Sequence, residues 1–132
     1  MNYQILNIHS DAVTDEIVQK ITLFCQLAAN EEKHDSAKNM QVLNWQTNSA
    51  SLLYLLLIEK RFSKENGGLQ LLMDVEKIVA ISGYYRSDFE AGIYLMGVRS
   101  LVLKEYRLNL LVAQYLLPFQ LEMIKKHGAH TA

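Results

Sequence analysis

Apolar and polar positions along the chain follow two different periods, and each change of period predicts an element. Residues 3–8 alternate at every second position, which is typical of a short strand. The next apolar side chains recur every three or four residues and would share one buried helix face, with Ser10, Asp11 or Thr14 as the cap. These positions are Val13, Ile17, Ile21, Phe24 and Ala28. The polar run over residues 31–39 predicts a loop after this helix.

A leucine-rich segment over residues 52–58 is the next apolar run. Leucine dominates over valine and isoleucine, and the apolar stretch is long for a strand, so helix is the preferred interpretation and strand the alternative. Asn48 or Ser49 would cap this helix, which would run to about Lys64. The Asn-Gly-Gly sequence at residues 66–68 would end it.

Three shorter apolar runs follow, and each predicts a strand. Residues 69–73 and 78–82 are separated by a polar connection, residues 74–77, which is a hairpin signal. A turn over residues 87–92 then leads into the third run, residues 93–103. This third run is strand-like along its whole length.

The period changes from two to 3.6 at Arg107, which predicts a helix from there to the Lys-Lys-His-Gly sequence at residues 125–128. Pro118 removes one helical hydrogen bond and would kink this helix near Gln114. Its buried face would carry side chains at spacings of three and four. They are Leu110, Ala113, Leu117, Leu121 and Ile124.

The predicted order is strand, helix, helix, strand, strand, strand, helix, which indicates an α+β fold with a mixed, mainly antiparallel sheet and packed helices. A length of 132 residues and a hydrophobic fraction of 50% fit one domain with one core. The alternative is an all-helical bundle. It would require the runs around Leu71, Ile81 and Leu95 to be helical despite their alternation and turn signals.

The net charge and the length of the apolar runs limit the kinds of partner that the sequence predicts. The net charge is −1, and Lys and Arg are spread along the chain, so nucleic acid is not expected as a partner. The run over residues 52–58 is far shorter than the ~20 residues of a membrane-spanning helix. The first residues lack the features of a secretion signal. Cys25 is the only cysteine, which fits a reducing, cytoplasmic location.

The junction at Arg107 is the strongest functional signal. The first amides of a helix have no partner within the helix, and beside a cation they form a natural seat for a phosphate. A strand that leads directly into such a helix start therefore indicates a nucleotide-like cofactor.

Two segments carry a resemblance to a known family. Residues 103–107, Leu-Lys-Glu-Tyr-Arg, are similar to the lead-in from the fourth strand in the GCN5-related N-acetyltransferases, and residues 78–83 resemble that family's third strand. The resemblance is to small, divergent members such as those of marine phages and metagenomes. It implies acyl transfer from acetyl-CoA to an unknown amine. The cofactor-binding residues it implies are Leu101, Val102, Leu103, Arg107, Leu108, Asn109, Leu110, Leu111 and Val112.

The sequence departs from the family pattern in two ways. Leu110 and Val112 occupy positions where the family uses glycine to bring backbone close to the cofactor pyrophosphate. In addition, the sequence stops where the family's fifth strand would begin, so we expect the later strands to be absent. Residues 93–103 would then form an exposed strand edge, and such an edge predicts a homodimer that pairs or exchanges elements across it.

Several alternatives stay open at this point. One alternative is a non-catalytic binding or assembly module that has lost the cofactor. For Arg107 the alternative is a solvated surface arginine. No catalytic residue is assigned, although a water or Glu90 is a candidate to accept the amine's proton. Cys25 is expected to be buried and inert, and no motif near His127 and His130 supplies the further ligands of a metal site.

Overall fold

The computed structural model describes residues 3–35, 47–127 and 130–131. Along the chain the elements are β1 (Gln4–Ile8), α1 (Asp15–Asp35), α3 (Ser49–Leu53), a π-helical turn (Tyr54–Ile58), β2 (Gly67–Asp74), β3 (Lys77–Arg86), β4 (Ile93–Val102), a 3-10 helix (Lys104–Asn109), a second π-helical turn (Val112–Leu116), α4 (Leu117–Lys126) and β5 (His130–Thr131). The fold is α+β, as the pattern of the sequence predicts.

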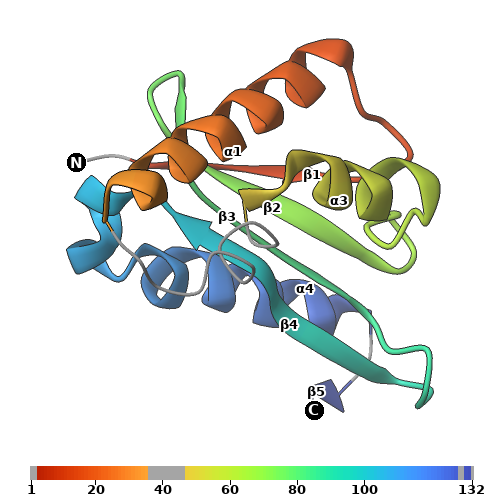
Figure 1. Ribbon diagram of the computed structural model, residues 1–132. Coiled ribbons are helices and arrows are strands. Elements are labelled where there is room, and N and C mark those ends of the chain that lie inside the picture. Colours follow the sequence, from red (N-terminus) through yellow and green to blue (C-terminus); the bar gives the residue numbers. More distant parts are fainter. Residues whose placement is uncertain (1–2, 36–46, 128–129, 132) are drawn as a thin grey trace.

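The strands form one sheet in the order β1-β2-β3-β4-β5. β1 to β4 are antiparallel neighbours, whereas β5 is parallel to β4. Figure 1 shows α1 and α3 on one face of this sheet and α4 on the other. The sheet therefore lies between two layers of helix.

The helix α1 forms as its amphipathic pattern predicts. The Thr14 hydroxyl accepts a hydrogen bond from the Ile17 amide at 3.2 Å, and two acidic residues follow in the first turn, where the helix dipole favours them. Ile21, Phe24 and Ala28 are buried. The predicted loop is wrong over residues 31–35, because glutamate and lysine are good helix formers and no Gly or Pro stops the helix. Residues 36–39 of that prediction lie outside the described residues.

The leucine-rich segment is helical, which confirms the preferred interpretation over the strand alternative. Asn48 caps it, with its side-chain oxygen 3.0 Å from the Ser51 amide. The helical geometry ends earlier than predicted, at Ile58, and Lys60 has a positive φ of 53°. A residue in this left-handed conformation cannot continue a right-handed helix.

The hairpin between β2 and β3 is confirmed, but its turn is tighter than predicted. Asp74 and Lys77 already pair across the two strands, so only Val75 and Glu76 form the loop. Val75 has a φ of 60°, the positive value that tight hairpin turns require.

The strand β4 is confirmed and contains two irregularities in its pairing with β3. Ser82 faces two residues of β4, Arg99 and Ser100, and Tyr84 faces Met96 and Gly97. Each is a β-bulge, which bends a strand and increases its local twist. Gly97 and Arg99 both have positive φ, 66° and 55°.

The region after β4 differs from the predicted continuous helix. Residues 104–109 form a 3-10 helix, Leu110 is left-handed, and the α4 region starts only after Leu111, so the predicted helix start at Arg107 is wrong. A π-helical turn one turn before Pro118 is the disturbance that this proline predicts near Gln114.

This later start changes which side chains are buried. The predicted stripe is wrong except for Ile124, because the π-helical turn inserts an extra residue into the spacing. The buried side chains are Leu111, Leu116, Gln120 and Ile124, whereas Leu110, Ala113 and Leu121 are exposed and Leu117 is half-buried. The expected absence of any strand after this helix is also wrong, since β5 pairs with Ile93 and Tyr94 of β4.

The π-helical turn at residues 54–58 offers a direct test of the core. Leu56 is fully buried, whereas its neighbour Leu57 is 36% exposed. We expect Leu56→Ala to lower the free energy of unfolding by about 2–5 kcal/mol through lost burial and a cavity. Leu57→Ala should cost clearly less in the same urea titration. Equal losses would contradict this placement of the core.

Candidate functional site

The candidate site is the junction between β4 and α4, together with the adjoining edge of the sheet. In Figure 1 the start of β1, the β2–β3 hairpin and this junction lie at the same end of the molecule. Leu101 and Leu103 are buried and anchor the end of β4. The Leu103 amide donates to the Val79 carbonyl at 3.0 Å, which extends the pairing with β3 to the start of the 3-10 helix.

Contacts with two other elements hold the 3-10 helix in place. The Lys104 amide donates to the Glu31 carboxylate of α1 at 3.0 Å. The Tyr106 hydroxyl donates to Asp74 of the hairpin at 2.9 Å, and this hydrogen bond raises the pKa of Tyr106 to about 12. The Lys77 ammonium lies 5.6 Å from the centre of the Tyr106 ring. The segment between β4 and α4 is thus attached on both sides of the sheet's end.

Arg107 points back toward the strand. Its Nε donates to the Val102 carbonyl at 3.3 Å, so this cation is held at the end of β4. The end of the 3-10 helix and Leu110 separate Arg107 from the first amides of the following helix. The prediction placed Arg107 in the first turn of that helix and is wrong, because the cation and the helix start are two separate features.

Leu110 is the conformational centre of the junction. Its φ of 52° and ψ of 43° are left-handed, a conformation that glycine adopts freely and that leucine adopts at a cost of about 1–2 kcal/mol. Its amide donates weakly to the Arg107 carbonyl, and its carbonyl accepts from Gln114 at 2.9 Å. Its side chain is 61% exposed. Residue 110 therefore has a backbone conformation that favours glycine, although a leucine occupies it.

A cavity of about 490 Å³ lies beside this turn. Its lining includes three of the predicted cofactor residues, Leu108, Asn109 and Leu111, and three that the sequence did not indicate. The latter are Tyr3, Gln114 and Tyr115. The rings of Tyr3 and Tyr115 meet edge to face with centroids 5.3 Å apart. No local signal marks this pair, because 112 positions of sequence separate residues that only the folded sheet brings together.

The remaining predicted cofactor residues do not line this cavity. Leu101, Val102 and Leu103 lie on β4 and just after it, and Val112 opens the π-helical turn. Among the described residues, β5 pairs only with Ile93 and Tyr94, so the outer edge of β4 carries no strand from residue 95 to residue 102. The predicted exposed edge, residues 93–103, is thus shorter by three residues, because β5 covers Ile93 and Tyr94 and β4 ends at Val102.

Other candidate residues lie away from the junction. Glu90 precedes β4 whereas Arg107 follows it, so a strand of ten residues separates them. Cys25 is buried, as expected, and burial raises the pKa of its thiol to about 11, which keeps it a neutral thiol. Among the described residues, no group of three or more His, Cys, Asp or Glu is placed to hold a metal ion.

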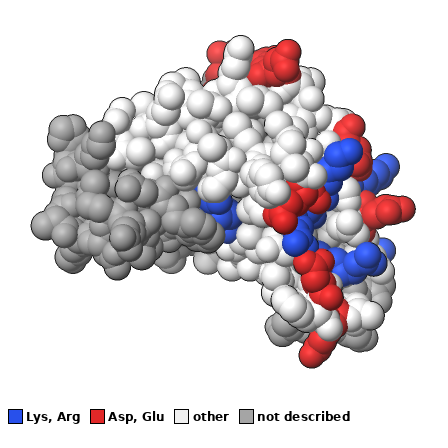
Figure 2. All heavy atoms as spheres, turned by 45° about the vertical axis from the view of Figure 1, so that its right-hand side comes forward, with Lys and Arg blue, Asp and Glu red and all other residues white. Residues whose placement is uncertain are grey.

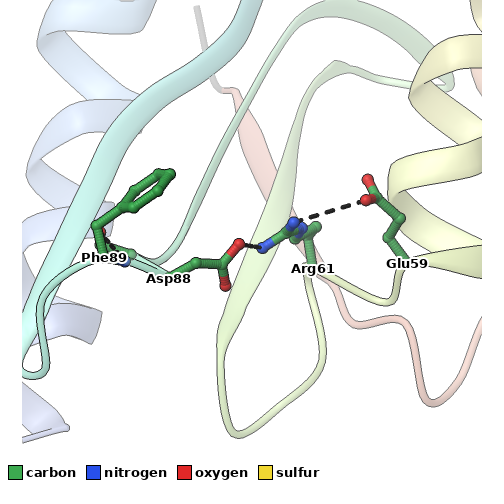
Figure 3. Close-up of polar contacts among 5 residues, drawn as sticks. Glu59, Arg61, Asp88 and Phe89 are labelled. Atoms are coloured by element: carbon green, nitrogen blue, oxygen red, sulfur yellow. Dashed lines mark hydrogen bonds and ion pairs between the residues drawn. The ribbon is translucent and has the colours of Figure 1, made fainter.

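An ion cluster occupies the opposite end of the sheet. Arg61 contacts Asp88 of the β3–β4 loop and lies 3.5 Å from Glu59 (Figure 3). Its guanidinium also lies over the Tyr85 ring, 5.5 Å from the ring centre. The hydrogen bond that the Arg61 guanidinium donates to the Asp88 carboxylate raises the pKa of Arg61. Figure 2 shows charges of both signs side by side on this face of the molecule. The cluster joins the loop to the end of the leucine-rich helix.

Comparisons with known proteins give no family. No family model matches the chain, and a search of curated proteins finds no significant match. Within the described residues, no helix is both long and apolar enough to cross a membrane.

Leu110 provides a stability test of the junction. In Leu110→Gly the relief of about 1–2 kcal/mol of left-handed strain outweighs or balances the ~0.5–1 kcal/mol entropic cost of glycine. We expect an unfolding free energy that is unchanged or up to about 1 kcal/mol higher. Leu108→Gly is the control, because Leu108 is 96% exposed and lies in the 3-10 helix without a positive φ.

The control variant should lose about 0.5–1 kcal/mol, since glycine has only its entropic cost there. Chemical denaturation of both variants measures the difference. A loss in Leu110→Gly as large as that in Leu108→Gly would show that residue 110 is not strained.

Proposed function

We propose that the protein is an N-acetyltransferase-like protein that binds acetyl-CoA along β4 and transfers the acetyl group to an amine. One observation carries the proposal: a bulged edge strand leads into a left-handed turn and a helix start beside a cavity of about 490 Å³. The Leu-Lys-Glu-Tyr-Arg sequence at residues 103–107, which resembles the N-acetyltransferases, lies between this strand and the turn.

The chain offers two kinds of group to such a cofactor. Among the described residues, no strand pairs with the outer edge of β4 from residue 95 to residue 102, so an extended arm like pantetheine can hydrogen-bond to this edge as an added strand would. The two backbone groups of Gly97 and the Val102 carbonyl already have side-chain partners. Amides of the first helical turn, around Leu111 and Val112, can face phosphate oxygens, with Arg107 as the nearest predicted cation. The cavity lined by Tyr3 and Tyr115 adjoins these amides.

Acetyl transfer needs the thioester held next to the amine, a group that removes the amine's proton, and a donor for the oxyanion. Backbone amides of β4 are the donors that this chain can supply. Glu90 lies at the far end of the strand, and we assign no residue as the base. The acceptor amine is likewise unassigned.

A non-catalytic binding or assembly module is the second candidate, and two observations favour it. The Leu110 and Val112 side chains stand where the family pattern has glycine, and a side chain keeps a pyrophosphate away from the backbone. Arg107 is engaged with the Val102 carbonyl. Under this proposal the free edge of β4 binds a second copy of the chain, and the predicted homodimer belongs here.

A titration with acetyl-CoA separates the two candidates. A ligand that binds only the native state stabilises it by RT ln(1 + [L]/Kd), so we expect the melting temperature of the wild-type chain to rise with the concentration of acetyl-CoA. Arg107→Ala should weaken binding about tenfold or more, because charge-assisted hydrogen bonds to phosphate are the strong ones. Arg86→Ala is the matched control, since Arg86 is an exposed arginine at the other end of β3.

The outcome decides between the candidates as follows. No shift at millimolar acetyl-CoA would contradict the acetyltransferase proposal. Binding that is absent in the wild type and present in Leu110→Gly would show that the scaffold is retained and that the leucine side chain blocks the cofactor. Equal weakening in Arg107→Ala and Arg86→Ala would remove Arg107 from the site.

A further inference from the structure

A chain of buried side-chain hydrogen bonds crosses the sheet on the face that α4 covers. Gln120 of α4 is fully buried, and its carboxamide makes three hydrogen bonds. Its Oε1 accepts from the Gly97 amide at 2.9 Å, and its Nε2 donates to Gln70 Oε1 and to Ser82 Oγ, both at 3.0 Å. One residue of the helix is thus bonded to three strands.

The serines close a ring on the same glycine. The Ser100 hydroxyl donates to the Gly97 carbonyl at 2.8 Å, and the Ser82 and Ser100 oxygens are 2.8 Å apart. Because the Ser100 proton goes to Gly97, the Ser82 hydroxyl is the donor between the two serines. Ser82 in turn accepts from Gln120. Both backbone groups of Gly97 are therefore held by side chains.

Gly97 is the residue at which β4 leaves regular pairing. It belongs to the first bulge, where Met96 and Gly97 together face Tyr84, and its φ is 66°. A bulge redirects the backbone groups that follow it along the strand. Those groups, over residues 98–102, form the part of the outer edge nearest the cavity. The orientation of Gly97 therefore sets the course of the edge that the proposed cofactor follows.

We propose that Gln120 is a positioning residue: with Ser82 and Ser100 it clamps both backbone groups of Gly97 and so fixes the outer edge of β4 for an extended acyl-carrying ligand. Gln120 acts through Gly97 and does not touch the ligand. The part of the proposal that concerns the ligand rests on the proposed function, whereas the clamp itself does not.

The test uses the full chain and three variants. Gln120→Met keeps the side-chain volume and removes all three hydrogen bonds. Ser100→Ala releases only the Gly97 carbonyl and serves if the first variant does not fold. Ile124→Val is the matched control, because Ile124 is fully buried on the same helix, one turn from Gln120, and has no hydrogen bond to β4 to lose.

Residue-resolved hydrogen exchange at Gly97 tests the clamp in the absence of any ligand. In Gln120→Met we expect exchange of the Gly97 amide to accelerate about tenfold or more beyond its change in Ile124→Val, because a buried amide has lost its acceptor. In Ser100→Ala the acceleration at Gly97 should be smaller but still exceed that in Ile124→Val. Equal exchange at Gly97 in all variants would overturn the clamp.

The affinity for acetyl-CoA tests whether Gln120 acts as a positioning residue. Where the wild type binds, the dissociation constant of Gln120→Met should rise about tenfold relative to Ile124→Val, at similar melting temperatures. A rise no larger than in the control, with Gly97 loosened, would leave Gln120 a structural residue and overturn the positioning role. If the wild type does not bind acetyl-CoA, the proposed function is wrong, and so is the part of this proposal that concerns the ligand. Hydrogen exchange at Gly97 would still show whether the clamp exists.

Discussion

The constraint on which the structure depends is the requirement that polar groups buried under α4 find partners. Gln70 and Gln120 are both fully buried, and an unpaired carboxamide there would cost several kcal/mol. Their hydrogen bonds run in one direction, from the Gly97 amide through Gln120, Gln70 and Asn7 to His9, which contacts the Gly67 carbonyl. The series starts at a backbone donor and ends at a backbone acceptor, so the orientation of each side-chain amide between them is fixed. The same order places the His9 proton on Nδ1, because Nε2 accepts from Asn7.

The two faces of the sheet are held in different ways. On the face of α1 and α3, Phe24, Leu52 and Leu56 form an apolar layer. Arg99 of β4 adds hydrogen bonds there, to Ser51 Oγ at 2.8 Å and to the Asn48 carbonyl at 3.1 Å. On the face of α4, hydrogen bonds that need defined geometry tie the helix to β2, β3 and β4. The strand with two bulges and an open edge is therefore the one whose course is held by directional bonds. Irregular backbone persists only where its surroundings determine it in this way.

Sequence reasoning succeeded where period and burial agree and failed where distant contacts decide. The stripe through Ile21 and Phe24 and the β2–β3 hairpin are local patterns, and both were predicted. The helix start was misplaced because the 3.6-residue period begins at Arg107, although the backbone stays in a 3-10 helix up to Leu110. Gln120 went unnoticed because a polar residue in an apolar stripe resembles a surface position. Its partners come from strands that only the sheet order brings together.

The choice between the two candidate functions depends more on the side chain at position 110 than on the backbone around it. Leu110 keeps a left-handed conformation that costs leucine about 1–2 kcal/mol, and such strain persists only where neighbouring contacts impose it. Those contacts are present, since Tyr106 and Leu111 are buried on either side and Tyr106 is bonded to Asp74. The turn is therefore held independently of what occupies position 110. It follows that a substitution at position 110 changes the side chain at the turn, while the surrounding packing maintains the backbone there.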